Sequence, residues 1–208
     1  MSLAEHVISL FGEEAFSKRP TFYNVEGALR FELGVGDDRA SYMSTALHRL
    51  HALLDDLGFK DHPIGIAAYY YTYDSTADEQ APPLHQQILP FARELRCWEE
   101  MKFCRSNFLR FSNDEDCFFA YHFGQIADNK DRLSTWINQH LMRGFEPSNL
   151  PLLMLFSLDL GIMINPYDDR GMDVFGPNRD LLELLYTKRN GWLLDYDREQ
   201  MDAIYKDT

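Results

Sequence analysis

The stretch Asn165-Pro-Tyr-Asp-Asp-Arg-Gly-Met-Asp-Val-Phe175 decides the fold of the C-terminal half of the chain. An apolar run precedes it at 162–164, and a short run of strand-forming residues follows its Asp-Asp-Arg-Gly turn. Asp and Gly are favoured in such turns because an Asp side chain accepts a hydrogen bond from the backbone two residues on and Gly permits positive φ. The pattern predicts two strands joined by a tight hairpin.

Outward from this hairpin, the remaining strands and helices follow from residue spacing. The segment 27–34 alternates, with Leu29, Phe31 and Leu33 on one face and Arg30 on the other, which predicts a half-buried strand. Apolar, β-branched or aromatic composition predicts further strands at 64–73, 103–111, 117–123 and 152–158. Helical spacing predicts helices at 3–11, 43–57 with Gly58 closing it, 86–101, 128–141, 178–190 and from Asp195 or Asp197 to 205.

Hairpins rather than βαβ units dominate this order of elements. We therefore expect one α+β domain over residues 1–208, with a mainly antiparallel or mixed sheet and helices packed chiefly on one face. The polar segment 74–85 contains Pro82-Pro83, which predicts an exposed and mobile loop.

The charge balance of the chain restricts its partners. The 33 acidic residues outnumber the 20 Lys and Arg, giving a net charge of −13. This argues against binding nucleic acid, which requires cationic contacts to phosphates, and against docking on anionic membranes. A basic protein partner is compatible with it. The three cysteines form no CxxC motif, no signal peptide is evident and no apolar run could span a bilayer, so we expect a cytoplasmic protein.

Two clusters of charge are the candidate functional residues. They comprise Asp168, Asp169, Arg170 and Asp173 in the hairpin, and Asp195, Asp197 and Arg198 near the C-terminus. Three of the carboxylates, on Asp168, Asp169 and Asp173, could bind Mg²⁺ or Ca²⁺, and an arginine could then bind a phosphate.

A structural interpretation explains the same residues and is favoured. The turn aspartates need no ligand, and an aspartate at the start of a helix is a common cap. On this interpretation Asp173 faces outward from its strand or pairs with Arg170 or Arg198.

Arg30 and Glu32 are secondary candidates, since they share one face of the first strand. If that face is covered, Arg30 needs a carboxylate or an anion beside it, because an unpaired buried charge is costly. A structural pair with Glu32 or with an aspartate is favoured.

Several enzyme classes lack their usual sequence motifs. No P-loop, dinucleotide-binding Gly-rich turn, nucleophile elbow, HExxH or EF-hand loop is present, and no cofactor is implied. The residues nevertheless resemble a known group: Phe22-Tyr-Asn with 29–34, Tyr167–Val174 and Trp192–Arg198 resemble a bacterial family that is a domain of unknown function. The resemblance implies a single-domain cytoplasmic protein and assigns no activity or catalytic residue.

The sequence supports two functional hypotheses. The first is a non-catalytic acidic interaction protein, of which immunity proteins and antitoxins that neutralise a basic partner are one version. The second is a metal-assisted hydrolase acting on a phosphate ester through Asp168, Asp169, Asp173 and Asp195, which requires these carboxylates to converge.

Overall fold

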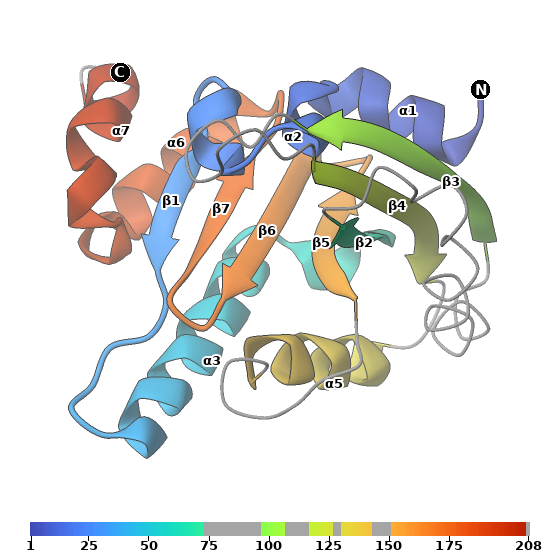
Figure 1. Cartoon of the computed structure of the whole chain (residues 1–208). Helices are drawn as coiled ribbons and strands as arrows, with labels where there is room; N and C mark the ends of the chain where they lie inside the picture. Colours follow the sequence, from blue (N-terminus) through green and yellow to red (C-terminus); the bar gives the residue numbers. More distant parts are fainter. Residues whose placement is uncertain (73–96, 107–116, 127–129, 143–150, 207–208) are drawn as a thin grey trace.

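A computed structural model describes residues 1–72, 97–106, 117–126, 130–142 and 151–206 (Figure 1). Its centre is an open seven-stranded sheet in which every pair of neighbours is antiparallel. The strands lie in the order β1 (Leu29–Glu32), β7 (Gly171–Phe175), β6 (Ile162–Asp168), β5 (Leu152–Ser157), β2 (Ile64–Thr72), β4 (Cys117–Ile126) and β3 (Cys97–Ser106). The predicted α+β class with a mainly antiparallel sheet is confirmed.

Helices cover both faces of the sheet rather than chiefly one. The α-helices within the described residues are α1 (Leu3–Phe11), α2 (Glu14–Ser17), α3 (Arg39–Asp56), α5 (Lys130–Leu141), α6 (Arg179–Lys188) and α7 (Arg198–Tyr205). Figure 1 shows α1 and α2 on one side of the sheet and α3 and α5 on the other. Both faces need covering because β5, β6 and β7 carry buried side chains at consecutive positions, as a strand buried on both sides requires.

Aromatic side chains tie α1 and α2 to their face of the sheet. The ring of Phe11 lies 6.4 Å from those of both Phe156 and Phe175, and the ring of Phe16 lies 5.3 Å from that of Tyr121. After α2 the chain passes through the short helical turn η1 (Thr21–Asn24) and enters β1. This route places η1 over β1 and β7, on the face of the sheet that α1 and α2 also cover. The charged residues described below lie on this face.

The helix predicted at 86–101 is wrong for its last five residues, which belong to β3. A register shift between Glu99 and Met101 breaks the pairing of β3 with β4. Such an irregularity interrupts the two-residue alternation of apolar and polar residues that identifies a strand. The apolar residues of this segment therefore fitted a helical spacing instead. The strands predicted at 103–111 and 117–123 correspond in part to β3 and β4, which pair antiparallel. The predicted loop 74–85, residues 107–111 and the start of the helix predicted at 128–141 lie outside the described residues.

Other local predictions are confirmed with small changes in their bounds. The strand predicted at 64–73 is β2, and it lies inside the sheet between β5 and β4. Gly58 follows α3 with φ of 71°, and Asn178 begins α6 by accepting a hydrogen bond from the Leu181 N–H. In the part of the chain that is described, no helix combines the length and the apolar character needed to cross a membrane.

The end of α3 is joined to the end of α6 by one acidic residue. Asp56 receives the Lys188 ammonium at 2.8 Å and the Arg189 guanidinium at 2.5 Å. Burial alone would raise the pKa of Asp56, but the hydrogen bonds and charges of Arg189 and Lys188 outweigh it, so its pKa lies below the usual value.

Substituting Asp56→Asn is expected to lower the free energy of unfolding at neutral pH by about 1–3 kcal/mol, as for a charged hydrogen bond. Because the pKa of Asp56 is depressed on folding, its stabilisation is present above the unfolded-state pKa and is lost as the pH falls through the folded-state pKa. The difference between parent and variant should therefore shrink below about pH 4 in urea titrations.

The neighbouring substitution Asp55→Asn is the matched control. Asp55 is 63% exposed and lies 3.6 Å from an exposed Lys60, so its loss should change stability by less than about 0.5 kcal/mol at any pH. A difference for Asp56→Asn that stays constant down to acid pH would contradict the ion-pair explanation.

Candidate functional site

The hairpin turn between β6 and β7 forms the predicted aspartate turn. The Asp168 carboxylate accepts a hydrogen bond of 2.9 Å from the Arg170 backbone N–H and binds the Arg170 side chain through its other oxygen. The Arg170 side chain is 75% exposed. Gly171 was expected to supply positive φ and does not. Its lack of a side chain is required instead by close packing, because a Cβ there would lie 2.0 Å from the Tyr167 hydroxyl.

Asp173 points into the protein, which corrects the prediction that it faces outward or pairs with Arg170 or Arg198. Its side chain is 1% exposed and accepts hydrogen bonds from Arg30 Nε at 2.7 Å and Arg30 Nη2 at 3.2 Å. The Phe22 backbone N–H also donates to it at 3.2 Å. Two strands and η1 therefore meet at one carboxylate.

Asp197 supplies a second buried carboxylate to the same arginine. Arg30 Nη1 donates to it at 3.2 Å and the Tyr23 hydroxyl donates at 2.7 Å. Asp197 occupies the position before α7, where a cap was expected, but its side chain makes no capping hydrogen bond. It lies in the short helical turn η5 (Asp195–Asp197), so the C-terminal segment is tied to the first strand of the sheet.

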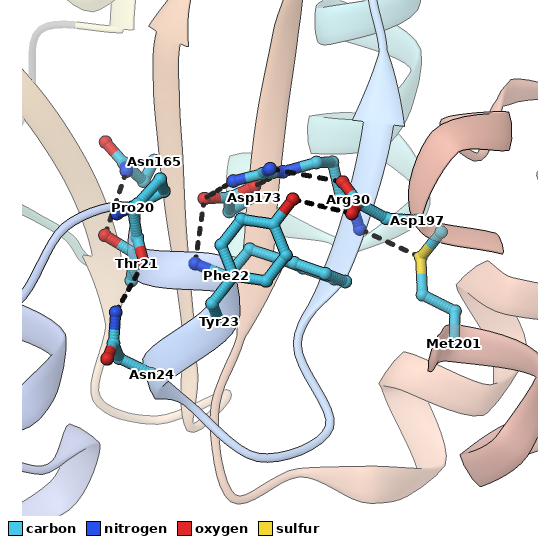
Figure 2. Close-up of polar contacts among 10 residues, drawn as sticks. All are labelled: Pro20, Thr21, Phe22, Tyr23, Asn24, Arg30, Asn165, Asp173, Asp197 and Met201. Atoms are coloured by element: carbon cyan, nitrogen blue, oxygen red, sulfur yellow. Dashed lines mark hydrogen bonds and ion pairs between the residues drawn. The ribbon is translucent and has the colours of Figure 1, made fainter. Parts of the chain in front are cut away.

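Aromatic rings complete the surroundings of the Arg30 guanidinium. Its central carbon lies 4.7 Å from the ring centre of Phe22, 5.1 Å from that of Tyr23 and 5.3 Å from that of Tyr167. Such rings attract a cation through their electron-rich faces. We call this set the Arg30 cluster, which consists of Arg30, Asp173, Asp197, Phe22, Tyr23 and Tyr167; Figure 2 shows most of it.

Glu32 is outside the cluster, so the expected alternative of an Arg30–Glu32 pair is wrong and the aspartate alternative is correct. The Glu32 side chain is 48% exposed and lies 3.7 Å from Arg49. Asp195 is also on the surface, with a side chain that is 97% exposed and 3.4 Å from Arg198. Arg198 chiefly binds Asn190, through its amide oxygen at 3.0 Å and its backbone oxygen at 2.8 Å.

The electrostatics of the cluster keep its arginine charged. Burial would lower the pKa of Arg30, but hydrogen bonds and charge from Asp173 outweigh it and raise that pKa further above neutrality. Burial raises the pKa of Asp173, an effect that Arg30 and the Phe22 N–H oppose. Burial likewise raises the pKa of Tyr167, which stays a neutral phenol at physiological pH.

A second inward arginine lies near the cluster and had no sequence signal. Arg19 donates hydrogen bonds to the Tyr121 hydroxyl and, at 2.9 Å, to the Ala15 carbonyl, and its guanidinium lies 4.9 Å from the Tyr69 ring centre. Its charge also acts on Asp173. Arg19 therefore adds a second positive charge near Asp173. Sequence reasoning also left Tyr23 and Tyr167 without a role, although both lie in the segments that carry the family resemblance.

The arrangement of the Arg30 cluster fits a role in stabilising the fold better than a role in catalysis. Arg30 and Asp173 direct their polar atoms at each other and at neighbouring groups of the chain, so their bonding capacity is used within the fold. In the described ranges, no three His, Cys, Asp or Glu side chains are grouped so that they could hold a metal ion. The clusters predicted from sequence are divided: the structure unites Arg30, Asp173 and Asp197 and leaves Asp168, Arg170, Asp195 and Arg198 outside. Asp169, in the turn between β6 and β7, is itself buried.

These features define a class: a single-domain α+β protein with an antiparallel sheet whose N-terminal turn and C-terminal helix meet on a buried arginine. Family comparison agrees with the resemblance noted in the sequence. The chain belongs to DUF3885, a domain of unknown function, whose family model matches residues 8–197. No curated protein and no solved structure gives a significant match.

Proposed function

We propose that this protein is non-catalytic and acts by binding a basic protein partner. The observation that carries the proposal is where the charges lie. The inward Arg30 is paired with Asp173 and Asp197 within the fold, whereas the chain has a net charge of −13. Exposed acidic residues occur on several elements, among them Glu13, Asp37, Asp61, Asp159, Asp180, Asp195 and Glu199. Complementary charge of this kind accelerates association with a positively charged protein.

Immunity proteins and antitoxins are one form that such a protein takes, because neutralising a basic toxin requires rapid and tight binding. The division of the candidate cluster supports a binding role over hydrolysis. A metal-assisted hydrolase requires convergent carboxylates, and here Asp195 is on the surface while Asp173 is occupied by Arg30.

The test is affinity capture with the whole chain as bait in extracts of the cells that make it, at salt concentrations of about 20 mM and about 200 mM. We expect a basic protein to be retained on the bait at low salt. At the higher salt, its rate of association with the bait should be lower by a factor of roughly 10 or more, because salt screens the attraction between opposite charges. Recovery of no basic protein at low salt would contradict the proposal.

Two surface variants make the test specific. One neutralises Asp180, Asp195 and Glu199 as the corresponding amides, and the other neutralises Glu13, Asp37 and Asp61 in the same way. Both remove three exposed negative charges and leave the Arg30 cluster unchanged. We expect the two variants to lose the captured partner to different extents, because an interface covers only part of the surface. Equal retention by both would show that exposed acidic residues do not direct the interaction.

A further inference from the structure

The C-terminal segment 193–205, here called the strap, is attached to the sheet by one row of buried side chains. Away from the sheet it contacts α6 and η4 (Asn190–Trp192), where Asp202 accepts from the Tyr186 hydroxyl at 2.7 Å and Arg198 donates to Asn190 at 3.0 Å. The strap contains η5 and α7, and its buried residues are spaced four apart: Leu193, Asp197, Met201 and Tyr205. All of its other residues are half-buried or exposed. Because only this row joins the strap to the sheet, few contacts are lost when the strap separates from the sheet.

All four buried residues of the strap contact the same short part of the chain, residues 27–31. Leu193 forms an isolated antiparallel bridge with Phe31. Asp197 pairs with the Arg30 side chain, the Met201 sulfur lies 3.2 Å from the Arg30 backbone nitrogen, and the Tyr205 hydroxyl donates to the Gly27 carbonyl. Three of the four anchoring residues therefore contact the first strand, and the fourth contacts Gly27, two residues before it.

The part of β1 that the strap covers is an outer edge of the sheet. Among the described strands, β1 is the terminal one and β7 is its neighbour. The backbone N–H and C=O of Arg30 point away from β7, toward the strap. The carbonyl accepts a hydrogen bond from the Leu194 N–H at 2.9 Å, and the N–H lies against the Met201 thioether. A thioether is a weak acceptor, so this edge is closed by fewer and weaker bonds than a paired strand provides.

We propose that the strap is a latch that opens separately from the sheet, and that its closure prevents β1 from pairing with β1 of a second copy of this chain. The Asp197–Arg30 ion pair and the Leu194–Arg30 backbone bond hold the latch shut. An open latch exposes the N–H and C=O of Arg30, and unpaired groups of this kind pair readily with the edge strand of another molecule. A second copy offers the same edge in the antiparallel direction.

Hydrogen exchange of the whole chain tests the opening. We expect strap amides to exchange at least about 10-fold faster than those of β5, β6 and β7, because the two units open independently. Asp197→Asn should increase exchange of the strap and of the Arg30 amide by a further factor of about 10. Asp195→Asn is the matched control, since it makes the same chemical change two residues away on a fully exposed side chain and should have no effect. Exchange of the strap only together with the sheet would overturn the proposal.

A second variant keeps the test decisive if Asp197→Asn fails to fold. Leu194→Pro removes the N–H that bonds to Arg30 while leaving the Arg30 cluster unchanged. Leu194 has φ of −66° and Leu193 has φ of −64° and ψ of 138°, values that proline and the residue before it adopt without strain. Leu194→Ala shortens the side chain but keeps the N–H, and is the control.

Sedimentation velocity then tests the role of the edge. We expect Leu194→Pro to form larger species than Leu194→Ala in a concentration-dependent manner. The same variant should show faster exchange of the Arg30 amide in dilute solution and renewed protection when it associates. A Leu194→Pro protein with an open strap but the same size as its control at every concentration would overturn the assignment of the strap as a guard of β1.

Discussion

Replacing Arg30 with methionine is expected to lower the free energy of unfolding by about 3–5 kcal/mol, the range for removing one partner of a buried ion pair. The cause is the pair of aspartates left behind. Asp173 and Asp197 are both buried, and the Arg30 guanidinium is bonded to each of them. Methionine fills similar space but cannot donate a hydrogen bond, so two carboxylates would lose their principal partner. Urea denaturation followed by tryptophan fluorescence measures the loss.

Two further variants distinguish an ion-pair effect from a packing effect. Arg170→Met makes the same side-chain change on the surface, where the arginine is bonded to Asp168, and should cost less than about 1 kcal/mol. Combining Arg30→Met with Asp173→Leu and Asp197→Leu removes the charges together, and the triple variant should be more stable than Arg30→Met alone. If the triple variant were the least stable of the series, packing rather than unpaired charge would explain the loss.

Local patterns identified most of the elements because each pattern reflects the surroundings of one segment. The alternation in 27–34 predicted β1, and the apolar face of 43–57 with Gly58 after it predicted α3 and its end. The prediction failed at Cys97–Met101 because a register irregularity hides the alternation there. Whether the second face of a strand meets water or another layer of the protein depends on distant segments. The sequence therefore predicted a half-buried strand with Arg30 on its open face, whereas Arg30 is only 7% exposed.

The same limit explains the result for the candidate site. The sequence named Arg30, Asp173 and Asp197, but the partners of Arg30 are 143 and 167 residues away from it along the chain. Asp173 alternates with the apolar Met172 and Val174, a pattern normally typical of a strand with one solvated face. Here η1 and the strap cover that face, and no local pattern predicts that cover. The prediction followed the density of charged residues along the chain. It therefore grouped Asp173 with Arg170, its neighbour in sequence, instead of with Arg30.

The second large effect is expected at Gly176, directly after β7. Substituting Gly176→Ala should lower stability by roughly 3 kcal/mol or more, because conformational strain and a steric clash each cost about 1–3 kcal/mol. Gly176 has φ of 152°, and a Cβ built there would lie 2.1 Å from the Gly161 carbonyl oxygen. The clash is with backbone, which no side-chain rotation can relieve. Thermal unfolding should show a midpoint lower by roughly 6–12 °C for a chain of this size.

Substitutions at two other glycines separate the cost of conformational strain from the cost of the steric clash. Gly12→Ala places an alanine at φ of 85° with nothing within 4 Å, so it should show the strain alone. Gly191→Ala, which has open space and no positive φ, should be nearly neutral. A cost for Gly176→Ala no greater than that for Gly12→Ala would mean that the contact with Gly161 yields easily.

The contact between Gly176 and Gly161 also bears on the Arg30 cluster. It lies at the open end of the β6–β7 hairpin, next to the paired residues Met163 and Phe175, and Asp173 is two residues further along β7. A shift of β7 at this end would move the Asp173 carboxylate relative to Arg30, which it meets at 2.7 Å. The double variant of Gly176→Ala with Arg30→Met should therefore lose less stability than the sum of the single losses, by about 0.5–3 kcal/mol. Strict additivity would show that the close packing of the hairpin and the ion pair are independent.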